Sequence, residues 1–155
     1  MTKEEKRVLF QNFLNNIKQI IEDKSPSGIR NEVCKRLKQN ISYYDWVGFY
    51  LSDGDENLIL HEFEGEPTIH TKIRFGEGIC GLAAVNKETF LVSDVTKEIN
   101  YLSCSIKVKS EIVVPIMREG NFIGELDIDS HTLCAFDETD REFLEELCSL
   151  IAEHL

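Results

Sequence analysis

The residues best suited to chemistry lie in the segment 76–130, which combines thiols and carboxylates. Two of its cysteines, Cys80 and Cys104, occupy corner or loop segments near glycines and charged residues, where a thiol is easier to reach than on an apolar helical stripe. Glu111 opens an apolar strand pattern further along the same segment. Together these groups predict thiol chemistry on a small charged substrate.

A ladder of carboxylates follows Glu111 in the sequence. Glu125, Asp127 and Asp129 alternate with apolar or small residues, so a strand would place all three acids on one face. That face is either a solvated outer surface or a pocket that binds an ammonium group. The second alternative follows because like charges held close together need a cation or a proton to offset them.

Other candidate motifs are less suited to function. The remaining cysteines, Cys34, Cys134 and Cys148, lie in contexts typical of packing. Residues 76–81 match a dinucleotide-binding glycine pattern, but the following segment is too short for the crossover helix and Glu77 would oppose a pyrophosphate. His131 and Cys134 have metal-ligand spacing without a second pair, so we expect no metal site.

The composition limits the possible partners. The 155 residues suit one domain, and a formal net charge of -11 argues against nucleic acid or anionic lipid. Five cysteines without framework spacing do not indicate structural disulfides. The amphipathic N-terminus has no apolar run of signal-peptide or membrane length, so we expect a cytoplasmic protein with no membrane partner.

The periodicity of apolar residues predicts helices at both ends and strands between them. A possible capping box joins Thr2 and Glu5 at the start of the first helix. The expected regions are N-terminal helices in 1–40, strands at 44–51, 58–63, 69–75 and 89–92, a short helix at 82–85, a hairpin of 111–117 with 122–129, and a last helix in 137–155. This order predicts an α+β fold, a central antiparallel sheet with the terminal helices on one face.

Residues 44–152 resemble a GAF domain, and more narrowly the free methionine-R-sulfoxide reductases with this fold. The resemblance rests on WVGFYL at 46–51, FGEGICG at 75–81, Cys104, SEIVVP at 110–115, Ile123-Gly124 and LDIDS at 126–130. It implies a single GAF domain over 1–155, with sheet and ligand pocket within 44–130 and the pocket on the face opposite the terminal helices. It also implies a homodimer.

The resemblance also implies roles for individual residues. Cys104 matches the nucleophile, and Glu111, Asp127 and Asp129 match the acids that hold or protonate the substrate, while Trp46 and Tyr50 match aromatics around its methylthio end. Thioredoxin would restore the thiol, and no metal or organic cofactor is needed. His70 stands where many members have a third cysteine, so Cys80 or an external thiol would resolve the oxidised Cys104.

A second function stays open at this point. The loop 100–105 is closer to GAF domains used as sensors, so the chain could be a non-catalytic module that binds a small ligand, or a regulatory dimer. Cyclic nucleotides fit poorly, because acids that face the pocket would repel a phosphate. The length of the chain leaves no room for an output domain, which favours the enzyme.

Overall fold

The structure is a computed structural model and describes residues 1–98, 101–102 and 105–155. Cys104, the expected nucleophile, lies outside the described residues. The main elements are α1 (Lys3–Ile20), α2 (Pro26–Asn40), β1 (Trp46–Ser52), β2 (Asn57–Glu64), β3 (Lys72–Arg74), α3 (Gly78–Asn86), β4 (Phe90–Val92), β5 (Ser110–Arg118), β6 (Asn121–Ser130) and α4 (Glu138–Ile151).

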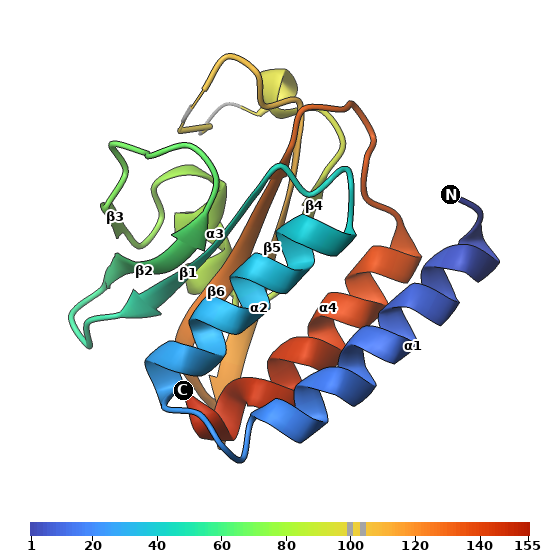
Figure 1. Cartoon of the computed structure of the whole chain (residues 1–155). Helices are drawn as coiled ribbons and strands as arrows, with labels where there is room; N and C mark the ends of the chain where they lie inside the picture. Colours follow the sequence, from blue (N-terminus) through green and yellow to red (C-terminus); the bar gives the residue numbers. More distant parts are fainter. Residues whose placement is uncertain (99–100, 103–104) are drawn as a thin grey trace.

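The strands form one antiparallel sheet in the order β3-β2-β1-β6-β5-β4. Figure 1 shows α1, α2 and α4 side by side on one face of this sheet, with α3 on the opposite side. The predicted α+β fold, with helices from both ends of the chain on one face, is confirmed. No helix among the described residues is long and apolar enough to cross a membrane.

The helix-covered face carries the larger apolar core. Phe49 on β1, Ile112 on β5 and Leu126 on β6 are fully buried there against the three helices. Because side chains alternate along a strand, the residues between these positions point to the other face. The three central strands therefore present a second set of side chains toward α3.

Two elements differ from the expected ones. Of the strand expected at 69–75, only β3 forms a ladder with β2, and a hydrogen bond from the amide of Leu60 to the carbonyl of Thr71 continues the pairing by one residue. The amide of Thr71 donates to the carbonyl of Ile69, so the residues before it form a local turn instead of a strand. The short helix begins at Gly78 instead of residue 82. Gly76 and Gly78 have φ angles of 92° and 62°, which allow the chain to turn directly from β3 into α3.

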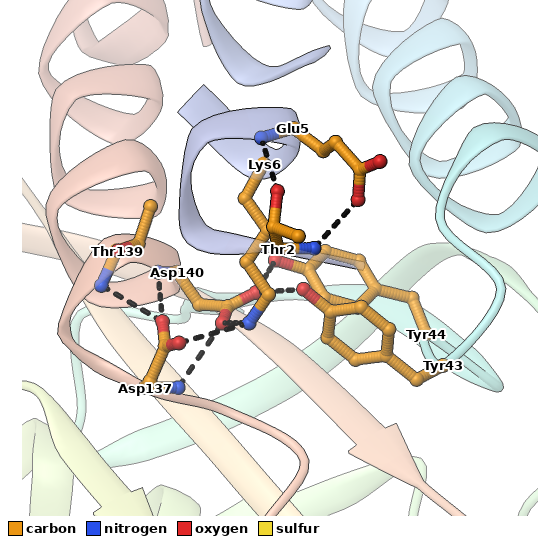
Figure 2. A network of polar contacts seen from close by, with 8 residues as sticks. All are labelled: Thr2, Glu5, Lys6, Tyr43, Tyr44, Asp137, Thr139 and Asp140. Atoms are coloured by element: carbon orange, nitrogen blue, oxygen red, sulfur yellow. Dashed lines mark hydrogen bonds and ion pairs between the residues drawn. The ribbon is translucent and has the colours of Figure 1, made fainter. Parts of the chain in front are cut away.

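A buried polar network joins α1, the start of β1 and α4 (Figure 2). Lys6 Nζ lies 2.8 Å from Asp140 Oδ2 and 3.1 Å from Asp137 Oδ2. The hydroxyl groups of Tyr43 and Tyr44 donate to Asp140 Oδ1 over 2.6 and 2.9 Å. Burial alone would lower the pKa of Lys6, but its hydrogen bonds to the two aspartates raise it. The network thereby holds the two terminal helices against the residues that lead into β1.

We expect Asp140→Ala to lower the free energy of unfolding by about 3–5 kcal/mol, because it leaves Lys6 charged and buried without its main partner. The side chain of Asp140 is fully buried and that of Lys6 is only 10% exposed. Urea denaturation measures the loss. Glu142→Ala, an exposed change on the same helix, serves as control, and equal stability of the two variants would contradict the assigned role of the network.

Candidate functional site

Strand register brings the predicted acids and aromatics onto one face of the sheet. On β6, Asp129 pairs with Trp46 of β1 on one side and with Glu111 of β5 on the other. Glu125 pairs with Tyr50 in the same ladder. Side chains of directly paired residues share a face of the sheet, so the register places the acids beside the aromatics and opposite the helical core.

The carboxylate ladder is buried. Glu125 is 0% exposed and Asp127 and Asp129 are each 3% exposed, so the alternative of a solvated outer face is wrong. Burial raises the pKa of all three groups, and the charge of Asp127 raises those of Glu125 and Asp129 further. Glu111 is 5% exposed and hydrogen-bonds to Asp127 and Asp129. Carboxyl groups in such contact hold at least one proton among them.

Glu125 is the acid whose burial is least compensated. Within the described part of the chain, neither of its side-chain oxygens accepts a hydrogen bond. We expect Glu125→Met to raise the free energy of unfolding at pH 8 by about 1–3 kcal/mol, the usual cost of burying an unpaired polar group. Denaturation with urea measures this increase in the free energy of unfolding, with a chelator present to remove trace metal ions.

The gain should depend on pH in a defined direction. The pKa of Glu125 is raised in the folded protein, whereas an unfolded glutamate titrates near 4.3. Glu125 therefore begins to lower the free energy of unfolding as the pH rises above about 4.3. This destabilisation increases until the pH reaches the pKa of Glu125 in the folded protein. A variant that is less stable than the native protein at pH 8 would contradict this interpretation.

Cys80 lies in the first turn of α3 and is 6% exposed, so the expectation of an accessible corner thiol is wrong. Because α3 starts early, the side chain of Cys80 lies over the face of the sheet that carries Glu111 and the carboxylate ladder, here called the acidic face. Its Sγ atom lies 3.9 Å from Glu111 Oε2. Burial, followed by the charges of Asp127 and Glu125, raises the pKa of this thiol. Cys80 is therefore a protonated thiol beside a carboxyl group that can accept its proton.

The two aromatic residues also hold the loop over the site. Trp46 Nε1 donates to the carbonyl of Glu66 over 3.0 Å, and Tyr50 Oη donates to the carbonyl of His70 over 2.7 Å. An exposed ion pair between Glu66 and Lys107 links the same loop to the segment before β5. The residues expected to enclose the substrate thus connect the sheet to residues 65–71.

Gly48 leaves space for the Trp46 indole ring. A Cβ atom at residue 48 would lie 2.3 and 2.6 Å from two ring carbons. We expect Gly48→Ala to displace the ring and to cost about 1–3 kcal/mol, as overpacking does elsewhere. Trp46 is the single tryptophan, so its fluorescence reports the displacement as a red shift. Unchanged emission and stability would contradict the crowding argument. Gly54→Ala, in open space but with a φ of 84°, strains only the backbone, so as a control it should leave the tryptophan emission unchanged.

Two small cavities lie on the acidic face. One, of about 20 Å³, is lined by Cys80, Glu111, Asp127 and Tyr50 among the predicted residues. His70, which stands in the place of the third family cysteine, also lines it and is half-buried. The second, of about 30 Å³, is lined by Trp46 and Asp129 with the polar residues Asp45, Glu66, Ser105 and His131. The predicted residues therefore divide between two neighbouring hollows, each with room for about one water molecule.

For the remaining cysteines, the structure confirms the expected packing of two and contradicts that of the third. Cys34 and Cys148 are buried, as their packing contexts predict. Cys134 is exposed, because it follows β6 in a loop and has a positive φ of 53°, so the expectation of packing there is wrong. Glu125 belonged to the predicted carboxylate ladder but had no assigned role. Its alternation with apolar residues in the sequence was the signal that predicted its place on the acidic face.

An antiparallel sheet with helices on one face and a buried polar face on the other defines a small α+β domain. The profile of the GAF domain matches residues 23–155, and the chain belongs to the GAF domain family.

Three relatives place the chain within this family. It is 38% identical over 153 residues to the GAF domain-containing protein A of Dictyostelium discoideum, covering 97% of this chain and 95% of that protein. It is 44% identical over 110 residues to the free methionine-R-sulfoxide reductase of Saccharomyces cerevisiae, covering 69% of this chain and 61% of that protein. The substrate-bound structure of free methionine-R-sulfoxide reductase from Neisseria meningitidis aligns with a TM-score of 0.89 at 35% identity, covering 94% of this chain and 87% of that one. The predicted resemblance to a GAF domain is confirmed.

Proposed function

We propose that this protein reduces free L-methionine-R-sulfoxide to L-methionine with the thiol of Cys104 as nucleophile. The observation that carries the proposal is the set of buried carboxyl groups around Glu111, which lie beside the Cys80 thiol and the aromatic residues Trp46 and Tyr50. The likeness to reductases of this name from yeast and Neisseria supports it. The protein would act as one GAF domain, in the cytoplasm and as a homodimer.

Recognition would use the two kinds of side chain on the acidic face. Asp127 and Asp129 would bind the ammonium group of the free amino acid, and Trp46 and Tyr50 would enclose the methylthio end. A cavity of about 20 Å³ is too small for this substrate, so binding requires it to widen. The loop 65–71 is the covering segment that would move. Hydrogen bonds from Trp46, from Tyr50 and from the backbone amide of Leu60 to the carbonyl of Thr71 would anchor it to the sheet.

The chemistry would proceed by transfer of oxygen from sulfur to sulfur. The Cys104 thiolate attacks the sulfoxide sulfur while Glu111 donates a proton to the oxygen. The attack forms a bond between the two sulfur atoms. The hydroxyl group then moves to the Cys104 sulfur while this bond and the substrate's bond between sulfur and oxygen break, so methionine leaves and Cys104 becomes a sulfenic acid. The substrate gains the two electrons that the thiol loses.

Cys80 would then resolve the sulfenic acid. Its sulfur attacks the Cys104 sulfur, a disulfide forms, and the bond between sulfur and oxygen breaks. The oxygen leaves as hydroxide, which takes a proton from the solvent to become water. Glu111, which has given up its proton, lies 3.9 Å from Cys80 Sγ and would accept the thiol proton during this attack. Thioredoxin, a cytoplasmic dithiol, would reduce the disulfide and restore both thiols.

A substrate with a blocked ammonium group tests the proposed recognition. The native protein should release methionine from the free R epimer and reduce N-acetyl-L-methionine-R-sulfoxide at least about 100-fold more slowly, because buried carboxyl groups would lose their cation. Equal rates for the two compounds would overturn the assignment of Asp127 and Asp129. Binding of the free R epimer without turnover would instead favour the sensor alternative.

A further inference from the structure

Three side chains from three elements converge at the bottom of the acidic face. Cys80 of α3, Glu111 of β5 and Asp127 of β6 each offer one ligand atom, and these atoms all lie within 4.8 Å of one another. All three residues are buried. One sulfur and two carboxylate oxygens form a donor set that suits a zinc ion.

The same place lacks a compensating cation. Among the residues that the structure describes, no lysine or arginine lines this cavity. Asp127 Oδ1 and both oxygens of Glu125 find no hydrogen-bond donor within the described part of the chain. The charge of Glu125 acts on Cys80, so a third acid faces the same cluster. The cavity therefore has unpaired acceptors and excess negative charge at one point.

The dimensions favour an ion. A tetrahedral zinc ion with a Zn–S bond of about 2.3 Å and a Zn–O bond of about 2.0 Å holds sulfur and oxygen roughly 3.5 Å apart. The observed separation of Cys80 Sγ and Glu111 Oε2 is 3.9 Å, so small side-chain rotations bring them to bonding positions. A volume of about 20 Å³ accommodates an ion or a water molecule without any movement of the covering loop.

We propose that Cys80, Glu111 and Asp127 form a zinc-binding site, with Glu125 as a neighbouring charge. Binding of the metal does not depend on the reductase function proposed above. The effect of zinc on activity does depend on that function, because a zinc ion bound there would occupy the acid and the resolving thiol of the reaction. Zinc would then inhibit the enzyme reversibly, and a chelator would restore it.

Metal titration of the Cys104→Ser protein tests the site directly, since that variant needs no activity and lacks the one cysteine outside the described residues. One Zn²⁺ per chain should bind in competition with a chromophoric chelator. Cd²⁺ should produce the ultraviolet charge-transfer band of a cadmium thiolate. Adding Cys80→Ser should abolish this band and weaken zinc binding by more than about 100-fold, since even loss of a residue that supports a ligand costs about 10–100-fold.

Two further variants complete the test, each made in the Cys104→Ser protein. Asp127→Asn should also weaken zinc binding at least about 10-fold, and Cys134→Ser, at an exposed thiol outside the cluster, should leave it unchanged. Thermal unfolding confirms that each variant is folded. Absence of stoichiometric zinc binding, equal affinity with and without Cys80, or loss of binding with Cys134→Ser would each overturn the proposal. Failure of the native protein to reduce methionine sulfoxide would leave the proposal intact.

Discussion

Cys104→Ser is expected to lower the rate of methionine formation from free methionine-R-sulfoxide by at least about 1,000-fold, because a serine hydroxyl cannot replace the attacking thiolate. Loss of an active-site nucleophile costs up to about 10⁶-fold in well-studied enzymes. The measurement is methionine released under single-turnover conditions, so that reductant supply does not limit the rate. Substrate binding, followed by calorimetry, should persist in the variant.

Cys80→Ser provides the matched comparison, since it removes a thiol from the same face. This variant should release one equivalent of methionine at close to the native rate and then stop when thioredoxin is the reductant. A small dithiol, which reaches the sulfenic acid itself, should support continued turnover. Full activity of Cys104→Ser, or loss of the first equivalent in Cys80→Ser, would contradict the assigned roles.

Glu111→Gln is expected to lower kcat by about 10²–10⁴-fold, the usual contribution of general acid catalysis. Glutamine keeps the shape of the side chain but cannot donate an acidic proton to the sulfoxide oxygen. Because the change acts on the transition state, kcat should fall while KM changes little. Steady-state kinetics with the R epimer measures both quantities.

The control for this substitution is Glu119→Gln, at the exposed turn between β5 and β6, which should keep native kinetics. A Glu111→Gln enzyme with native kcat and a raised KM would show that Glu111 binds substrate without donating the proton. That result would move the acid role to another carboxyl group of the ladder.

Local sequence patterns were sufficient for much of the fold. The capping box of Thr2 and Glu5 marks the start of α1. The last helix, expected from residue 137, begins at Glu138 with Asp137 as its N-cap. The central hairpin of β5 and β6 follows directly from its alternating pattern and the turn at 118–121. These features depend on neighbours in the chain, which is why they can be predicted without tertiary contacts.

Features that depend on distant contacts were not predictable. Alternation placed Glu125, Asp127 and Asp129 on one face, but burial of that face depends on segments from elsewhere in the chain. The helix α3 packs on this side of the sheet, and hydrogen bonds from Trp46 and Tyr50 hold the loop 65–71 there. Cys80 was expected to be accessible because the glycines around it are typical of a loop, whereas α3 begins at Gly78 and includes Cys80. His70 reaches the cavity through a loop with no regular pattern.

The most direct test of the reductase proposal is thioredoxin-coupled consumption of NADPH by the native protein with free L-methionine-R-sulfoxide. The S epimer and the Cys104→Ser variant are measured in parallel. We expect turnover of the R epimer alone, matched by an equal amount of methionine and lost in the variant. No turnover with either epimer, with thioredoxin or with a small dithiol, would contradict the proposal and leave a ligand-binding GAF domain.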